Sequence, residues 1–344
     1  MKATIVREHG GLDALLQEEV PTPEPGPGEV QVAVEAAALN HLDLWVRRGV
    51  PGHRFPLPMI PGCDGAGTIS AVGAGVSADR VGEKVVLAPG LSCGECFYCS
   101  TGQDHLCATY GILGETRDGT NAEFLTLPAE NALPRPAGLT AAESAALPLV
   151  FLTAWGMLFD RAQLKSGETV LVHAAGSGVG SATIQLAKLV GARVIATAST
   201  PEKRAAAEEL GAEATFDYTQ EGWSKEIYRW SGKQGLDVVV EHAGAETFPQ
   251  SLRCLKKGGR LTFCGATSGA EVTLNLRAIF FKSWSILGST MGSRGTLHRI
   301  FDLAGQGLVR PVIDRVLTFE EVAQAHGALE DRAQFGKVVL SRES

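Results

Sequence analysis

The chain has 344 residues, 44% of them hydrophobic, which suggests about two domains with a sizeable core in each. Acidic residues outnumber Lys plus Arg by 38 to 31, and no basic run is long enough to follow nucleic acid phosphates. The longest uncharged apolar stretch, 144–159, contains Pro148 and is too short to span a bilayer, and the N-terminus lacks the apolar core of a secretory signal. We therefore expect a cytoplasmic protein, with neither nucleic acid nor a membrane as a partner.

The first 130 or so residues are typical of an irregular β-rich domain. The segment 21–28 is too rich in Pro and Gly for a helix or a central strand, and strand-like runs follow at 30–36, 62–72 and 81–88. Near Leu139 the pattern becomes helical, with Thr140 and Glu143 at the spacing of a capping box and Pro148 as a break. We place the end of the first domain at residue 140.

Four cysteines of this first domain lie within 15 residues, in the pattern C-x2-C-x2-C-x7-C: Cys93, Cys96, Cys99 and Cys107. Thiolates this close in sequence surround one tetrahedral ion, and a site with four sulfur ligands and no open position is structural. An iron–sulfur cluster fits less well, because the last spacing is long and no proline follows Cys107. We expect one structural Zn²⁺ in a lobe over 90–110, and a reducing compartment, since this is not a disulfide framework.

From residue 141, strand-like and helical segments alternate. Apolar, β-branched runs at 169–174, 193–198, 237–243, 260–265 and 285–290 predict parallel strands buried on both faces. Between two of them, Pro201 opens a helix and Gly211 ends it. The pattern predicts an α/β fold, with a doubly wound parallel (Rossmann) sheet over 141–292. The tail, 293–344, ends in a further strand-like run, and we expect it to return to the first domain.

A turn of small residues, 175–180, joins the first of these strands to a helix. Aligned on its last glycine, it has Ala175, Ser177 and Gly180 where a dinucleotide-binding fingerprint has glycines. The backbone N–H groups of Ser177, Gly178, Val179 and Gly180 would then meet a pyrophosphate at the positive end of the helix dipole. In isolation, a tight strand–helix connection also explains so degenerate a match. The alternating strands favour the dinucleotide site.

The end of the second strand indicates which dinucleotide binds. NAD-selective enzymes usually have an acidic residue there for the ribose 2′-hydroxyl, and this chain has none. It has Ser199 and Thr200 instead, followed by Lys203 and Arg204, a set suited to a 2′-phosphate. Alternatively, the hydroxyls cap the next helix and the cations are solvated. Together with the turn, these residues favour NADPH.

Taken together, these features resemble the medium-chain dehydrogenase/reductase superfamily, which includes zinc alcohol dehydrogenases and quinone oxidoreductases, over nearly the whole chain. The stretch 167–188 resembles the quinone oxidoreductase and zeta-crystallin signature, with Ser177 in place of a glycine. The resemblance implies a GroES-like catalytic domain with a Rossmann domain inserted into it. It implies a homo-oligomer, a dimer or tetramer, with 283–290 as a candidate edge strand for pairing. The cofactor contacts that it implies are His41, Lys203, Tyr218, Gly244, Gly265 and Ser289.

The same resemblance argues against a catalytic zinc. Zinc alcohol dehydrogenases have ligands Cys, His, Glu and Cys at the positions of Asn40, Cys63, Asp64 and about Leu149, and most of these are changed here. Adjacent Cys63 and Asp64 cannot alone supply the three ligands that such a zinc needs. The proton-relay hydroxyl of those enzymes would fall at Leu42, which has none.

The segment 40–49 instead looks like the zinc-free reductase version, with four side chains expected to face the active-site cleft: Asn40, Asp43, Trp45 and Arg47. The alternative is that Asn40 and Asp43 fix a loop by local hydrogen bonds and that Trp45 is a core residue. Cys63 and Asp64 complete the candidate catalytic residues. They form either a residual metal site with His41, or Cys63 is a buried spectator.

The leading hypothesis is an NADPH-dependent oxidoreductase that transfers hydride to a small molecule, a quinone or an α,β-unsaturated carbonyl, without a catalytic metal. Asn40, the cofactor ribose or water would donate to the substrate oxygen, and the proton would come from solvent, since no side chain stands out as a general acid. The alternatives are a zinc-dependent alcohol dehydrogenase acting with altered ligands and a non-enzymatic NADPH-binding protein.

Overall fold

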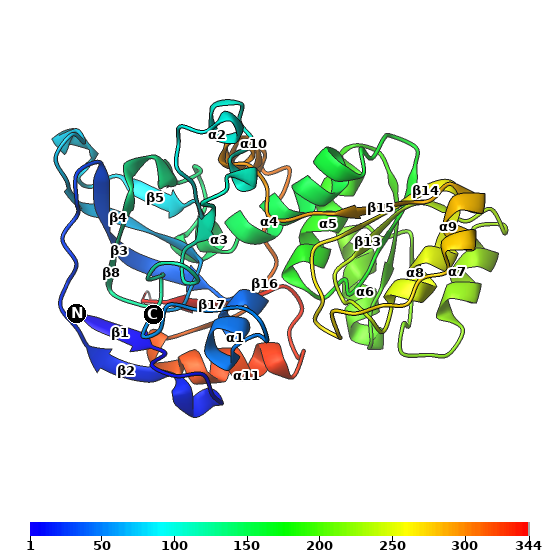
Figure 1. Cartoon of the computed structure of the whole chain (residues 1–344), viewed down its shortest axis with the longest axis horizontal. Helices are drawn as coiled ribbons and strands as arrows, with labels where there is room; N and C mark the ends of the chain where they lie inside the picture. The colour runs from blue at the N-terminus through cyan, green and yellow to red at the C-terminus, as the bar shows by residue number, and fades with distance from the viewer. Residues whose placement is uncertain (343–344) are drawn as a thin grey trace. The chain divides into compact units, whose positions relative to one another are not determined.

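The structure is a computed structural model that describes residues 1–342 (Figure 1). The chain forms two compact units: Met1–Leu149 with the segment from Ser293 onward, and Val150–Gly292. The first unit extends beyond residue 140, where the sequence suggested a boundary. The reason is that helix α3 (Ala141–Ala145) buries Ala141 and Ala145 in a cluster of small residues that includes Ala36 and Ala66.

The first unit is built on a seven-stranded sheet. Its strand order is β16-β17-β3-β4-β5-β9, and β8 also pairs with β3. The strands are β3 (Glu29–Ala38), β4 (Asp64–Val72), β5 (Lys84–Leu87), β8 (Phe124–Pro128), β9 (Ala132–Pro134), β16 (Ile313–Leu317) and β17 (Lys337–Ser341). Two small sheets accompany it, β1 (Lys2–Ile5) with β2 (Leu16–Glu19) and β6 (Gly90–Leu91) with β7 (Gly111–Ile112).

Strand β3 organises this unit because it pairs with three others. It is antiparallel to β4, β8 and β17, and the last pairing brings the C-terminal tail into the first unit. Alternate residues Val30, Val32 and Val34 are buried in the main core of the unit, as the period-2 pattern requires. Within the first 130 residues helix is scarce, in agreement with the β-rich domain that the sequence predicted there. The helices are α1 (His41–Arg48), α2 (Phe97–Ser100), α3, α10 (Arg294–Gly305) and α11 (Val322–Glu330), with short 3-10 turns at Leu12–Ala14, Ala78–Arg80, Asp104–Leu106, Ala129–Asn131 and Phe319–Glu321.

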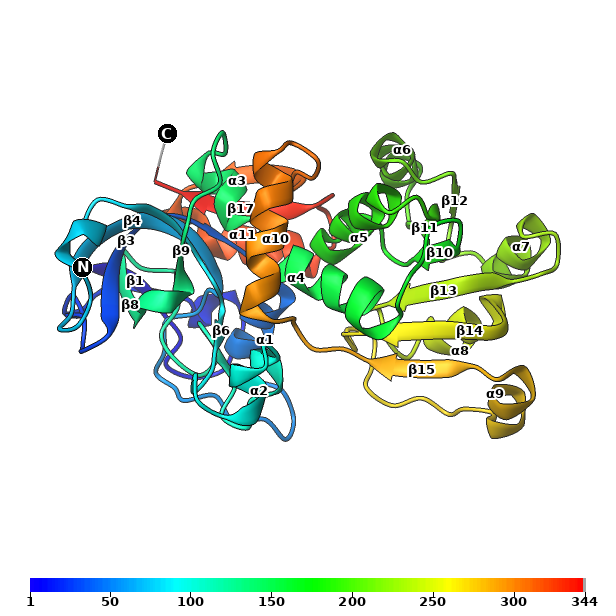
Figure 2. The ribbon, with the colours of Figure 1, turned by 90° about the horizontal axis from the view of Figure 1, so that it is seen from above.

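The second unit is a doubly wound parallel sheet, as the alternating pattern predicted. Its strand order is β12-β11-β10-β13-β14-β15 (Figure 2). The chain therefore runs outward from β10 to β12, crosses back, and continues with β13 on the other side of β10, so the strand order reverses between β10 and β13. The strands are β10 (Thr169–Val172), β11 (Arg193–Thr197), β12 (Ala214–Phe216), β13 (Leu236–Glu241), β14 (Leu255–Phe263) and β15 (Ser285–Gly288). In such sheets, ligands bind beyond the carboxyl ends of the strands at this point of reversal.

Helices precede the first of these strands and connect the others. They are α4 (Pro148–Trp155), which continues into the π-helical turn Gly156–Arg161, α5 (Gly178–Leu189), α6 (Pro201–Leu210), α7 (Trp223–Trp230), α8 (Phe248–Cys254) and α9 (Leu276–Lys282). Leu171 and Val239 pack with Trp223 and Leu252 of α7 and α8, while their strand neighbours Val170 and Val238 are equally buried on the opposite face. Strand β12, which the sequence analysis missed, is three residues long and only half-buried.

Residues Ala141–Arg161 form one helical stretch of 21 residues that is long and apolar enough to cross a membrane. The sequence analysis judged the uncharged run 144–159 too short and took Pro148 as a break. The break is present, since α3 ends at Ala145 and Pro148 opens α4, but the helical stretch on both sides of it is longer than the uncharged run. Inside the protein, 72% of the most apolar window of this stretch is buried, as is typical of a core helix.

Candidate functional site

The turn before α5 has the geometry of a dinucleotide cradle. Ser177 caps the helix, with its hydroxyl accepting from Gly180 N at 2.8 Å, while its own N–H donates to Ala174 O at 2.8 Å. A Cβ at Gly180 would lie 2.5 Å from Ala174 O, so only glycine lets the helix approach the strand this closely. The sequence analysis offered the N–H groups of Ser177 and Gly180 to the pyrophosphate, but both are used within the turn, by Ala174 O and the Ser177 hydroxyl. The first-turn N–H groups of Gly178 and Val179 have no intrahelical acceptor, so they are the donors that this turn leaves for an anion.

A buried polar network fixes the loop after β13, next to this turn. The Glu241 carboxylate, fully buried, accepts from the N–H groups of Ala243 at 2.7 Å and Gly244 at 3.2 Å. Its other oxygen accepts from the Ser251 hydroxyl at 2.7 Å, and His173 shares a hydrogen bond with the same hydroxyl. Burial lowers the pKa of His173, so this imidazole is neutral and structural.

The expected nicotinamide-side residues follow three adjacent strands, β13, β14 and β15. Gly244 has φ +105°, and a Cβ there would lie 2.8 Å from Gly269 O. A Cβ at Gly265 would lie 2.7 Å from His242 O, and Ser289 N donates to Phe263 O at 2.9 Å. These positions therefore share the carboxyl edge of the sheet, where a cofactor binds.

The end of β11 has no acidic residue, as the sequence indicated. The Thr200 hydroxyl caps α6 and accepts from Lys203 N at 3.3 Å. For this hydroxyl, the capping role that was the alternative to phosphate binding is therefore correct. Ser199 lies beside it, half-buried. Tyr218 packs partly against the apolar cluster beneath α7. Arg204 forms an ion pair with Asp217, which follows β12.

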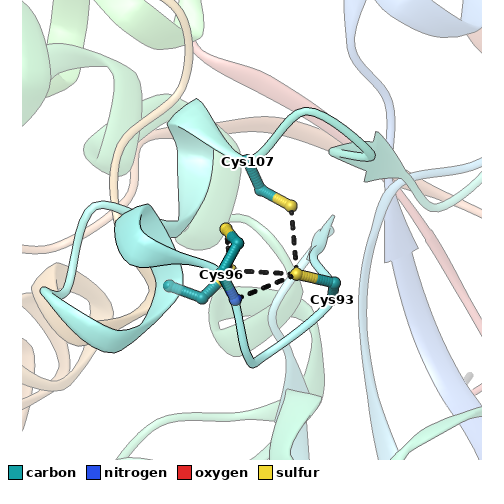
Figure 3. A group of neighbouring side chains, drawn as sticks. Cys93, Cys96 and Cys107 are labelled. Atoms are coloured by element: carbon teal, nitrogen blue, oxygen red, sulfur yellow. Dashed lines mark hydrogen bonds between the residues drawn. The ribbon is translucent and has the colours of Figure 1, made fainter.

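The four cysteines of the lobe converge as a metal site requires. Figure 3 shows Cys93, Cys96 and Cys107 of this group. The sulfur atoms lie within 4.8 Å of one another, with Cys93 Sγ 3.8 Å from Cys99 Sγ and 3.6 Å from Cys107 Sγ. A tetrahedral zinc with bonds of about 2.3 Å places its sulfurs about 3.8 Å apart, so the cluster fits the ion. The Thr109 hydroxyl beside Cys107 lowers the pKa of that thiol to about 6, which favours the thiolate that a metal needs.

The first unit also contains a buried polar cluster made of Asn40, Cys63, Asp64 and Lys337. The Lys337 ammonium donates to Asn40 Oδ1 at 2.7 Å and to Asp64 Oδ2 at 3.1 Å. The Asn40 amide donates to Asp64 Oδ2 at 2.8 Å and to Cys63 Sγ at 3.2 Å. Asp64 Oδ1 accepts from Leu149 N at 2.9 Å. Thus the four positions compared with zinc ligands do meet, and the oxygens that would bind a metal are already bonded.

Lys337 is the member of this cluster that the sequence analysis missed. It opens β17 at the C-terminal end of the chain, and its side chain is only 3% exposed. A lysine that begins an otherwise apolar strand was the available signal, because a buried ammonium requires an acidic or amide partner.

Asp43 fixes the backbone here and does not face a cleft. It is 1% exposed, and its two oxygens accept from Asn40 N at 2.7 Å and Gly62 N at 3.0 Å. Burial raises the pKa of Asp43 to about 6, although these two N–H groups oppose the shift. The loop-fixing alternative is therefore correct for Asp43. Asn40 has both roles, since its N–H closes this capping box and its side chain belongs to the cluster.

The other expected residues of α1 differ in exposure. Arg47 is buried and pairs with Glu330 of α11, so the expectation that it faces a cleft was wrong. Trp45 is 36% exposed and is not a core residue. His41 is half-buried, and burial, with Arg332 and Lys337 nearby, lowers its pKa, so it is neutral at pH 7.

Burial also raises the pKa of the Cys63 thiol, which keeps it protonated.

Comparisons with known proteins match both units of the chain to dehydrogenases and oxidoreductases. Models of an alcohol dehydrogenase GroES-like domain and of a zinc-binding dehydrogenase match residues 26–137 and 178–306. A zinc-type alcohol dehydrogenase-like protein of Schizosaccharomyces pombe is 34% identical over 97% of this chain and 96% of its own length. A quinone oxidoreductase of Rattus norvegicus is 32% identical over 99% of this chain and 97% of its own. The crystal structure of an NAD-dependent alcohol dehydrogenase matches with a TM-score of 0.95 and 49% identity, over 99% of each chain.

Proposed function

Because the chain belongs to the medium-chain dehydrogenase/reductase superfamily and is an NAD(P)-dependent oxidoreductase, we propose that it reduces a quinone or an α,β-unsaturated carbonyl with NADPH, without a catalytic metal. The similarity to a quinone oxidoreductase supports the acceptor class. Bound NADPH would supply the hydride. The N–H groups of Gly178 and Val179 would hold its pyrophosphate, and Gly244, Gly265 and Ser289 would line the nicotinamide half.

The position of the Lys337 ammonium is the main support for a mechanism without a catalytic metal. It binds Asn40 Oδ1 and Asp64 Oδ2, and the Cys63 thiol is protonated and accepts from the Asn40 amide. A zinc at this cluster would have to displace a buried cation and deprotonate a thiol whose pKa burial has raised. The ammonium therefore takes the place of a metal cation beside Asp64.

The cluster would act on the substrate through charge and positioning. Reduction of a quinone or an enone places negative charge on an oxygen, and a fixed ammonium in low-dielectric surroundings stabilises such charge. The Asn40 carbonyl orients the ammonium, but both N–H groups of its amide are already donated to Asp64 and Cys63, so the cofactor ribose or ordered water would donate to the substrate oxygen. The proton that completes the reaction would come from solvent.

Cofactor choice is the second part of the proposal. No acidic residue ends β11, and Lys203 and Arg204 follow it on α6, which favours the 2′-phosphate of NADPH. The matched crystal structure is that of an NAD-dependent alcohol dehydrogenase. Because that protein depends on NAD, the ratio of kcat/KM with NADPH to kcat/KM with NADH is the measurement that tests the proposed cofactor choice.

A steady-state panel with NADPH tests the function directly. Quinones and enones should be reduced, and primary and secondary alcohols should not be oxidised with NADP⁺, before and after dialysis against a chelator. Alcohol oxidation that zinc restores after chelation would favour the zinc-dependent alcohol dehydrogenase alternative. Tight NADPH binding without turnover on the whole panel would favour a non-enzymatic role.

We also propose that a second copy of the chain covers one edge of the second unit. Strand β15 is an edge strand that pairs only with β14 among the described strands, and the adjacent helix α9 exposes Leu276, Phe280 and Phe281 by 62–72%. Edge strands and apolar patches of this kind are typical of interfaces. Light scattering should show an oligomer, and Phe280→Glu with Phe281→Glu should dissociate it, whereas Leu308→Glu, an exposed control in the first unit, should not.

The cysteines agree with a reducing, cytoplasmic location, which we propose on this basis. All seven are free thiols in the structure, and four of them form the metal site. Disulfides are rare in reducing compartments, where clustered cysteines more often bind a metal.

A further inference from the structure

Two charged side chains meet at the carboxyl ends of β11 and β12. Arg204 Nη1 lies 3.1 Å from Asp217 Oδ2, and the two side chains are 24% and 21% exposed. The same nitrogen donates to Ala198 O, at the end of β11, at 3.4 Å. The guanidinium is therefore held at the end of the second strand, where a Rossmann sheet binds the adenosine ribose of its dinucleotide.

Asp217 is itself held in place. Its Oδ1 accepts from Thr219 N at 3.0 Å and from the Thr219 hydroxyl at 2.7 Å, which leaves Oδ2 for Arg204. Burial alone would raise the pKa of Asp217, but the bonds from Thr219 and the charge of Arg204 lower it. The carboxylate is therefore ionised at neutral pH, and its position does not depend on Arg204 alone.

The two charges have opposite effects on the two cofactors. A guanidinium near the ribose attracts a 2′-phosphate, whereas a carboxylate repels it and accepts a hydrogen bond from a 2′-hydroxyl. In the Arg204–Asp217 pair, the carboxylate neutralises part of the cation's field. The acidic residue that usually ends the second strand is absent, and Asp217, which directly follows the third strand, lies beside the cation instead.

We propose that the Arg204–Asp217 pair determines how strictly the enzyme discriminates between NADPH and NADH, with Arg204 favouring the phosphorylated cofactor and Asp217 limiting that preference. The inference rests on the proposed use of NADPH. The inference assigns to Asp217 the part of the specificity that allows NADH to bind, although Asp217 follows β12 and does not lie at the end of β11.

Four variants test the pair: Asp217→Asn, Arg204→Ala, the double variant, and Glu213→Gln as a matched control. Glu213 pairs with Arg193 at the opposite ends of the same two strands, far from the carboxyl edge. The readouts are Kd for NADPH and for NADH by fluorescence titration, and kcat/KM for both with one acceptor. Thermal melting of each variant checks that the fold is kept.

Asp217→Asn should raise the NADPH/NADH ratio of affinities by about fivefold, the effect of one partly exposed charge, and Arg204→Ala should lower it by about tenfold. In the double variant the ratio should be higher than in Arg204→Ala, because the repulsive carboxylate is gone. Glu213→Gln should leave the ratio within about twofold of the wild-type value.

Two results would overturn the inference. One is an Asp217→Asn ratio equal to that of the control. The other is an Asp217→Asn ratio that falls as in Arg204→Ala, since Asp217 would then only hold the arginine. A wild-type preference for NADH would instead contradict the proposed cofactor, and the direction of change in each variant would still decide the role of the pair.

Discussion

Replacement of Lys337 by methionine is the most informative perturbation of the buried cluster. The side chain keeps a similar length but loses the ammonium, so the Asp64 carboxylate, which is fully buried, loses its only cationic partner among the described residues. Breaking a buried ion pair in this way costs about 3–5 kcal/mol. For a unit of this size, that cost corresponds to a fall in Tm of roughly 6–20 °C.

The assay is thermal and urea unfolding of Lys337→Met, Asp64→Asn and the double variant. Because Lys337 and Asp64 contact each other at 3.1 Å, the double variant should be more stable than the sum of the single effects predicts, by at least about 1 kcal/mol. Lys256→Met removes a lysine that is 45% exposed in its pair with Asp237, and this control should cost less than about 1 kcal/mol. A Lys337→Met protein as stable as the control, or a cycle without coupling, would refute the role of the ammonium.

Three further outcomes are expected. Cys96→Ser should lose the zinc and lower the melting temperature, yet leave Kd for NADPH within about twofold, because the lobe and the dinucleotide turn belong to different units; loss of NADPH binding would contradict this. Gly180→Ala should weaken NADPH binding by about tenfold or more, measured by titration, because its Cβ would lie 2.5 Å from Ala174 O; unchanged affinity would argue against the cradle. Asp43 has a pKa of about 6 in the folded state, above its usual 3.8, so the folded protein binds this proton more tightly than the unfolded chain does. Its contribution to the free energy of unfolding therefore falls by up to roughly 3 kcal/mol as pH rises from 4 to 6. Asp43→Asn should remove that fall, and parallel pH–Tm curves for the two proteins would count against the shift.

Local sequence patterns predicted much of the fold because their causes are local. The capping box of Thr140 and Glu143 forms as expected, and Gly211 ends α6 with φ +114°, a conformation that glycine adopts readily. The buried strands of the parallel sheet were recognisable because both of their faces are apolar. Strand β12 was missed because its three residues are half-buried and carry too little of that pattern.

The candidate site was predicted less completely, because its contacts join distant parts of the chain. Lys337 is 297 residues from Asn40 and 273 from Asp64, and no local pattern connects them. The role of Asp43 was more accessible, since a residue three positions after a helix-capping Asn commonly accepts from the cap backbone. The burial of Arg47 depends on α11, which the sequence analysis did not place.

The zinc content of the active enzyme tests the central claim most directly. Metal analysis of freshly purified protein that reduces a quinone or an enone with NADPH should give one zinc per chain, held by Cys93, Cys96, Cys99 and Cys107. Two zincs per chain, with activity lost when the second is removed, would contradict a reductase in which the Lys337 ammonium stands beside Asp64 in place of a metal.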